Sequence, residues 1–168
     1  MDAIVLTDDP AVVRGLRALL EADRENRPPP EDLPDRLIVG PEDARRKYEG
    51  LIEGARSRIH LIDPKADDPA LIALLKARRE AGIDVIVFDQ KELAGLRSHG
   101  KIMLVDDAVA VVGGLSLNAL GLDFRREVAI VVDEPAAVAE IRGLFEQVAA
   151  PSAPPDEAGP AAQGDTPC

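Results

Sequence analysis

Residues 58–88 read RIHLIDPKADDPALIALLKARREAGIDVIVF and contain two short apolar runs separated by a helical pattern. The first run, residues 58–62, and the second, residues 83–88, have the length and β-branched content of buried strands. Between them, Asp68 before a proline suits a helix N-terminus, and Gly82 suits the end of that helix. Two strands joined by one helix form a βαβ unit with parallel strands, which predicts an α/β fold.

Further strands are expected on the same sheet. Residues 101–105 and 108–112 are apolar apart from Lys101 and are separated by two aspartates, which predicts an antiparallel hairpin. A last strand is expected at 128–132, followed by a helix over 135–148. Ahead of the βαβ unit, Pro41 suits the first position of a helix with an apolar stripe. The sequence therefore predicts a mixed β-sheet flanked by helices.

Composition divides the chain into four parts. Residues 37–150 have the alternating strand and helix patterns of one domain. Residues 24–36 mix charged side chains with four prolines and are interpreted as a linker. Residues 151–168 lack aromatic and large aliphatic side chains, so a disordered tail is expected there. Residues 1–23 are expected to form a strand followed by a helix.

That N-terminal strand and helix share a pattern with residues 129–146. Both segments have an apolar strand, an acidic residue before proline, and a helix with matching apolar positions. One interpretation is that any strand-to-helix turn uses such caps. The other is that residues 1–23 close a preceding repeat, which would make this chain the second half of a two-repeat architecture.

The composition weakens several classes of function. A formal net charge of −11 argues against sequence-independent attraction to nucleic acid or anionic membranes. Three Phe, one Tyr and no Trp make a base-stacking platform improbable. Two His and one Cys do not suffice for a Cys/His zinc cluster, so neither metal nor cofactor is expected. No apolar segment approaches the ~18 residues that cross a bilayer. We expect a cytoplasmic protein, with peripheral membrane contact if its substrate is a lipid.

One cluster of residue types suits phosphoryl chemistry. Residues i and i+2 of a strand face the same side, so His99 and Lys101 would present an imidazole and an ammonium together. Imidazole is a nucleophile near neutral pH, and lysine supplies a point charge for phosphate oxygens. Gly113 and Gly114 would let a ligand approach the backbone. Glu127 is placed to accept a hydrogen bond from the second ring nitrogen of His99.

This pattern resembles the signature of the phospholipase D superfamily, H-x-K-x4-D-x6-G-G/S-x-N. Five residues match it position by position: His99, Lys101, Asp106, Gly113 and Gly114. The resemblance covers about residues 37–150, and Glu127 falls where the family has a glutamate supporting the histidine. The final Asn of the signature is replaced by Ser116, with Asn118 two residues later. Either side chain is expected to serve as the phosphate ligand.

The resemblance implies metal-independent cleavage or exchange of a phosphodiester through a phosphohistidine. His99 would attack phosphorus, while Lys101 and the segment 116–118 would hold the phosphate oxygens. Asp106 and Glu127 would orient the catalytic groups. The family also needs a second histidine to protonate the leaving group. This chain has one such motif, so the second histidine would come from a homodimer partner or from a missing first half.

Three other polar residues have structural interpretations. His60 has Ile62 where the motif requires a lysine, so it is expected to be a partnered strand residue. Asp63 and Asp89 follow two predicted strands, at the edge where α/β sites gather, but aspartates in such turns are usually caps or turn formers.

The leading hypothesis is a phospholipase D-like phosphodiesterase or phosphatidyltransferase acting on phospholipid. The N-terminal pattern favours the two-repeat branch, which includes cardiolipin synthase-like enzymes. A nuclease of the same superfamily is an alternative, disfavoured by the acidic charge and the few aromatic residues. A second alternative is an inactive single-motif remnant that acts as an interaction module, which the missing second motif and Ser116 favour.

Overall fold

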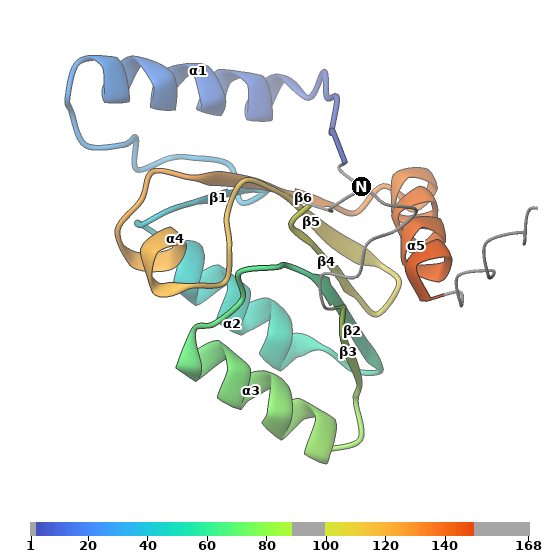
Figure 1. The fold of residues 1–168 in the computed structure, drawn as a ribbon. Coiled ribbons are helices and arrows are strands. Elements are labelled where there is room, and N and C mark those ends of the chain that lie inside the picture. Colours follow the sequence, from blue (N-terminus) through green and yellow to red (C-terminus); the bar gives the residue numbers. More distant parts are fainter. Residues whose placement is uncertain (1–2, 89–99, 150–168) are drawn as a thin grey trace, which may run out of the picture.

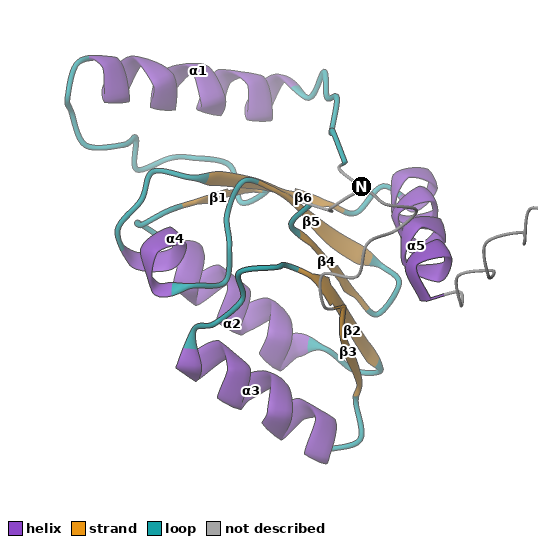
Figure 2. Cartoon of the chain, in the orientation of Figure 1, coloured by secondary structure: helices purple, strands orange, loops and turns teal. Residues whose placement is uncertain are grey.

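The computed structural model describes residues 3–88 and 100–149 and contains one mixed sheet with helices on both faces (Figures 1 and 2). The helices are α1 (Pro10–Arg24), α2 (Ala44–Gly54), α3 (Pro69–Glu80), α4 (Ala119–Asp123) and α5 (Pro135–Ala149). The strands are β1 (Leu37–Val39), β2 (Arg58–Ile62), β3 (Asp84–Phe88), β4 (Ile102–Val105), β5 (Val109–Gly113) and β6 (Val128–Val132). The expected tail at 151–168 lies outside the described residues.

The six strands lie in the order β1-β6-β5-β4-β2-β3. β2 and β3 are connected by α3 and pair in parallel, as the βαβ pattern predicts. β4 and β5 form the expected antiparallel hairpin, and β4 also pairs antiparallel with β2. β6 joins β5 to the short edge strand β1, again antiparallel. The α/β class and the mixed sheet are therefore confirmed.

Successive residues of the central strands pack on opposite faces of the sheet. Met103 lies in the core formed with α2, α3 and α4, whereas the next residue, Leu104, lies in the core formed with α5. A third apolar cluster joins α1 to β1 through Val12, Leu19, Leu37 and Val39. Because helices cover both faces, all four residues of β4 are buried. No helix in residues 3–88 and 100–149 is long and apolar enough to cross a bilayer.

The structure differs from the sequence-based expectation around Pro41. The helix begins at Ala44, not at Pro41, and the Gly40–Pro41 peptide bond is cis. Asp43 precedes the helix, and its carboxylate accepts a hydrogen bond from the Val39 amide at 2.8 Å. Residues 40–43 are therefore a turn that connects β1 to α2. Strand β1 has three residues and is too short to give a periodic signal in the sequence.

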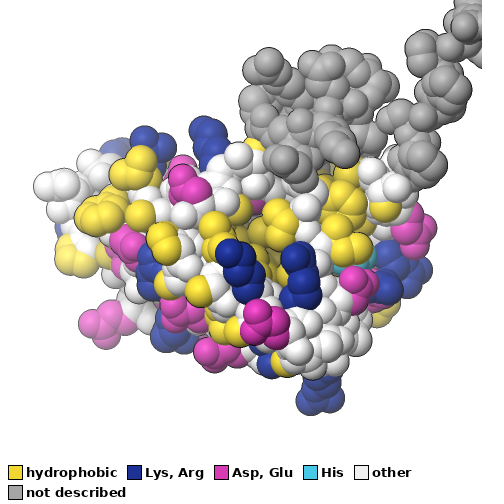
Figure 3. Space-filling view, turned by 60° about the horizontal axis from the view of Figure 1, so that its bottom comes forward, with side chains coloured by type: hydrophobic (Ala, Val, Ile, Leu, Met, Phe, Trp, Pro, Cys, Tyr) yellow, Lys and Arg dark blue, Asp and Glu magenta, His cyan; other side chains and the backbone are white. Residues whose placement is uncertain are grey.

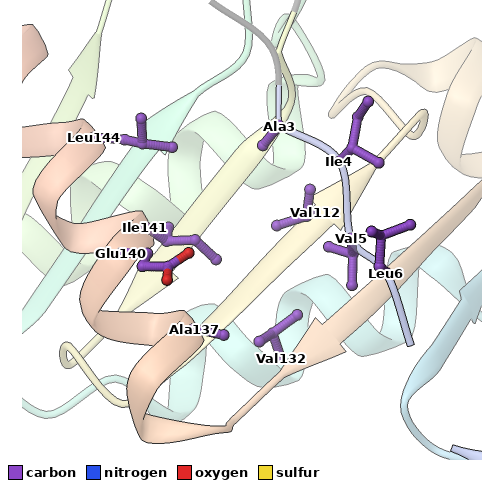
Figure 4. Close-up of a pocket in the computed structure, with 10 residues that line it drawn as sticks. All are labelled: Ala3, Ile4, Val5, Leu6, Val112, Val132, Ala137, Glu140, Ile141 and Leu144. Carbon is purple, nitrogen blue, oxygen red and sulfur yellow. The ribbon is translucent and has the colours of Figure 1, made fainter. Parts of the chain in front are cut away.

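The strand expected within residues 1–23 is also absent from the sheet, as far as residues 3–23 show. The helix expected after it is present: α1 begins at Pro10, and Oδ1 of its cap residue Asp9 accepts a hydrogen bond from the Ala11 amide at 2.8 Å. Residues 3–6 instead cross over β5 and β6 beside α5 (Figure 4). Ile4 and Leu6 are 87% and 93% exposed. β5 and β6 already pair on both sides, so this position offers the segment no free sheet edge.

The packing of α1 predicts that it unfolds together with the sheet. Leu19 is 2% exposed, whereas its neighbour Leu20 is 67% exposed. We expect Leu19→Ala to lower the free energy of unfolding by about 2 to 4 kcal/mol, because it leaves a cavity against β1. Leu20→Ala makes the same change in helix propensity and should cost less than about 0.5 kcal/mol. Urea denaturation of both variants measures the difference, and equal losses would contradict this packing.

Candidate functional site

Most of the predicted site residues lie at one end of the sheet. Because β4 runs antiparallel to β2 and β5, the start of β4 lies beside the ends of those two strands. Lys101 directly precedes β4, and Asp63 directly follows β2. Gly114 follows β5, and Glu127 directly precedes β6 at the same end. The topology thus gathers residues that are up to 64 positions apart in the sequence.

Lys101 is half-buried and held by the backbone of the neighbouring strand. Its Nζ donates a hydrogen bond to the carbonyl oxygen of Gly114. Its charge also acts on the carboxylate of Asp63. His99 lies outside the described residues, so the expectation that it faces the same side as Lys101 stays a prediction.

Glu127 presents a buried acceptor at this end of the sheet. Its Oε2 is inaccessible to solvent and has no hydrogen-bond partner among residues 3–88 and 100–149. A buried carboxylate oxygen without a partner is costly, so such an atom is suited to a donor that approaches it. This environment is compatible with the expected contact to His99. The same buried region includes Tyr48, whose pKa is raised by burial and by the charges of Asp63 and Glu127.

The segment after β5 contains both residues expected as phosphate ligands. Ser116 is 3% exposed. Asn118 is the N-cap of α4, and its Oδ1 accepts a hydrogen bond from the Gly121 amide at 2.8 Å. Its Nδ2 donates to the carbonyl of Lys65 at 3.4 Å. Because the cap uses Oδ1, Asn118 would contact a phosphate through its amide hydrogens.

The two glycines of the motif have different surroundings. A Cβ on Gly113 would lie 2.4 Å from the carbonyl oxygen of Val128 and 2.5 Å from Cα of Ala129. Gly113 is therefore needed for the close approach of β5 and β6. A Cβ on Gly114 would have its nearest neighbour at 3.9 Å. Of the two glycines, Gly114 leaves open space beside the backbone.

Asp106 lies at the opposite end of β4 from Lys101. It is in the β4–β5 turn with φ of 53°. Its carboxylate accepts hydrogen bonds from the amides of Arg56, Ser57 and Arg58 at 2.8 to 3.1 Å. The implied role of Asp106 in orienting the catalytic groups does not fit this position. Its contacts fix the connection between α2 and β2.

Other candidates have structural contacts. The ring of His60 packs against Phe88 and Phe145, with centroids 5.9 and 5.6 Å away, as expected for a partnered strand residue. Arg126 donates hydrogen bonds to Asp23 and Glu42, and is thereby engaged within the protein. Asp89 lies outside the described residues. Within residues 3–88 and 100–149, no group of three His, Cys, Asp or Glu side chains is arranged to hold a metal ion.

Sequence reasoning named Asp63 as a residue at a strand end and favoured a role as cap or turn former. Only 5% of this residue is exposed, and its carboxylate contacts the Ser116–Asn118 segment through the Leu117 amide. Its position after a strand was visible in the sequence, but a turn former has the same position. The structure shows the turn contact, because Oδ1 of Asp63 accepts a hydrogen bond from the Lys65 amide. It adds a contact across 54 residues, which leaves no local pattern in the sequence.

The contacts of Asp106 predict acid-sensitive stability. Burial opposes ionisation, but the amides of Arg58, Arg56 and Ser57 outweigh it and lower the pKa of Asp106 to about 2. A lowered folded-state pKa stabilises the fold above about pH 4, and this stabilisation is lost as the pH falls toward 2. We expect Asp106→Asn to lower the free energy of unfolding at pH 7 by about 1 to 2 kcal/mol. The difference from the wild type should shrink in urea denaturation at pH 2.5, and a constant difference would contradict the prediction.

The two glycines form a matched pair for a second test. Gly113→Ala should lower the free energy of unfolding by about 1 to 3 kcal/mol, because the new methyl group would collide with the backbone of β6. Gly114→Ala introduces the same methyl group into open space and should change stability by less than about 0.5 kcal/mol. Thermal unfolding of both variants measures the difference. Equal effects would show that β5 and β6 do not approach as closely as described.

Comparison with known proteins identifies the family. The family model described as "Cardiolipin synthase, PLD-like domain" matches residues 60–149. No curated protein sequence matches the chain.

Several solved structures share the fold. Nuc from Salmonella typhimurium, a phospholipase D family member, has a TM-score of 0.59 at 16% identity, over 66% of this chain and 90% of Nuc. Polyphosphate kinase from Porphyromonas gingivalis has a TM-score of 0.71 at 18% identity, over 83% of this chain and 26% of the kinase. Phosphatidylserine synthase from Haemophilus influenzae has a TM-score of 0.52 at 16% identity, over 67% of this chain and 37% of the synthase.

The structural likenesses concern the fold, and they agree with a sequence match that spans more than half of the chain. The chain belongs to the phospholipase D superfamily, in the family of cardiolipin synthase PLD-like domains.

Proposed function

We propose that this chain provides one half of a phosphodiesterase or phosphatidyltransferase site that acts on phospholipid through a phosphohistidine at His99. Members of its family act as phosphodiesterases, nucleases or phosphatidyltransferases. The observation that most supports the proposal is the gathering of Lys101, Glu127 and the Gly114–Asn118 segment at one end of the sheet. These are the parts that phosphoryl transfer requires beside a nucleophile.

In the proposed reaction, a ring nitrogen of His99 forms a bond to phosphorus while the bond from phosphorus to the leaving oxygen breaks. A proton donor protonates that oxygen. Water or an alcohol then attacks the phosphohistidine, loses a proton and releases the imidazole. Lys101 would balance the charge on the phosphate oxygens, and its bond to the Gly114 carbonyl restrains the ammonium near the loop. Glu127 would hold the second ring nitrogen of His99.

The proton donor for the leaving group is proposed to come from a second copy of this chain or from another part of a longer protein. The sequence contains two histidines. His60 lies on β2 with a side chain 13% exposed, packed between Phe88 and Phe145. A histidine in this position is unsuited to reach the end of the sheet where Lys101 lies.

The surface favours a local headgroup interaction over a long nucleic-acid track. Acidic and basic side chains are interspersed with hydrophobic ones on the face drawn in Figure 3. The guanidinium of Arg126 is already engaged by two carboxylates. A phosphate bound by such a surface would be held by a few specific groups, because non-specific binding to nucleic acid depends on many unpaired cations.

Intact-protein mass spectrometry tests the nucleophile. The wild type, His99→Ala and Lys101→Met are incubated with bis(p-nitrophenyl) phosphate and, separately, with phosphatidylcholine vesicles. We expect a phospho-adduct and product release with the wild type, no adduct with His99→Ala, and turnover reduced by at least about 100-fold with Lys101→Met. Lys76→Met, an exposed change on α3, is the matched control.

Three outcomes would contradict the proposal. Turnover that survives in His99→Ala would exclude this nucleophile. A folded wild type that forms no adduct and no product with either substrate would favour the interaction module. Turnover of the small diester but not of phosphatidylcholine would contradict a phospholipid substrate and favour the nuclease branch.

A further inference from the structure

Asp63 connects the end of β2 to the segment that follows β5. Its Oδ2 accepts a hydrogen bond from the Leu117 amide at 2.6 Å, and its Oδ1 accepts one from the Lys65 amide at 2.9 Å. Both oxygens of a buried carboxylate are therefore satisfied by backbone donors. Such charge-assisted bonds are stronger than those between neutral groups.

The residues that follow Asp63 also bind the carbonyl oxygen of Leu117. The amides of Asp67 and Asp68 donate to this oxygen at 3.1 and 3.0 Å. The side chain of Leu117 is 2% exposed and belongs to the core beneath α2 and α3. Both backbone polar groups of Leu117 are thus bound by residues 63–68, which fixes the orientation of its two peptide units.

An ion-pair network ties this segment to the neighbouring helices. Asp68 caps α3 through the Leu71 amide at 3.0 Å. Its carboxylate also accepts two hydrogen bonds from Arg45 of α2, at 3.0 and 2.8 Å. Arg45 in turn pairs with Asp123 of α4 at 2.6 Å. Residues 63–68 are therefore a rigid base against which the loop after β5 is held.

We propose that Asp63 is a positioning residue that sets the Gly114–Asn118 loop, and through it the Lys101 ammonium, for phosphate binding. This inference rests on the proposed function of that loop. Leu117 lies between the two residues expected to contact phosphate, Ser116 and Asn118, so fixing its peptide units fixes both. Lys101 is bonded to Gly114 at the start of the same loop.

The electrostatic surroundings of Asp63 provide a means to observe this contact. Burial raises the pKa of Asp63 above its ordinary value of 3.8, against the opposing effects of the Leu117 and Lys65 amides, Lys101 and Ser116. The charge of this carboxylate also raises the pKa of the Tyr48 phenol. Protonation would remove the charge from the acceptor of the Leu117 amide. The amide resonance of Leu117 therefore reports on the contact.

Steady-state kinetics tests the positioning role. Asp63→Asn keeps the size of the side chain but replaces one accepting oxygen with a donor. We expect kcat/KM for bis(p-nitrophenyl) phosphate to fall about tenfold, chiefly through a higher KM, because the phosphate ligands lose their placement. Ile141→Val, a buried change on α5 across the sheet, controls for general loss of stability and should leave KM within about twofold. Asp63→Asn kinetics equal to those of Ile141→Val would overturn the proposal.

Nuclear magnetic resonance of the uniformly ¹⁵N-labelled chain tests the contact without requiring turnover. We expect the Leu117 amide of the wild type to shift as Asp63 titrates, with a midpoint above 3.8, and this titration to be lost in Asp63→Asn. A Leu117 amide that does not respond to pH in the folded wild type would overturn the anchoring. If the wild type has no activity, the proposed function fails, and this measurement alone decides whether Asp63 holds the loop.

Discussion

Strand β4 is the constraint on which the rest of the structure depends. It pairs with β2 on one side and β5 on the other, and all of its residues are buried between the two helical layers. A strand held on four sides has a fixed direction and register. Its two ends therefore lie at fixed places, Lys101 at one and Asp106 at the other. Every other residue of the site is located relative to the first of these ends.

This constraint gives the spacing of the sequence motif a physical meaning. The four residues between Lys101 and Asp106 are the strand itself. Asp106 binds the amides that lead into β2, and Asp63 binds the amide of Leu117 at the far end of that strand. A carboxylate thus fastens a loop at each end of β2, and only that of Asp63 is buried. Asp63 and Asp106 both accept hydrogen bonds from backbone amides. Asp63 lies at the end of the sheet where Lys101 lies, and Asp106 lies at the opposite end.

The sequence predicted those elements whose signal is local. The βαβ unit, the hairpin, the strand at 128–132 and the helix after it have clear periodicity and caps. β1 has three residues, too few for a period. The continuous apolar run of residues 3–6 does not reveal whether a sheet edge is available. In the candidate site, Lys101 was named from the motif, and Glu127 was named from the wider resemblance to the family. The resemblance implied that Asp106 orients the catalytic groups, but Asp106 lies at the other end of β4 from Lys101. The contact of Asp63 with Leu117 was not predicted, because the two residues lie 54 positions apart.

The contacts of Asp63 and His60 show whether either residue suits the role of proton donor to the leaving group in the proposed reaction. A carboxyl group with a raised pKa near Lys101 is a candidate for the missing acid, and Asp63 meets that description. Its two oxygens, however, accept hydrogen bonds from the Leu117 and Lys65 amides, and both bonds favour the ionised form, which has no proton to donate. His60 is enclosed by two phenylalanine rings on another part of the sheet. Neither of these two groups within residues 3–88 and 100–149 fits, which supports a proposed donor from a second copy of the chain or from a further segment of a longer protein, placed at the end of the sheet where β4 begins.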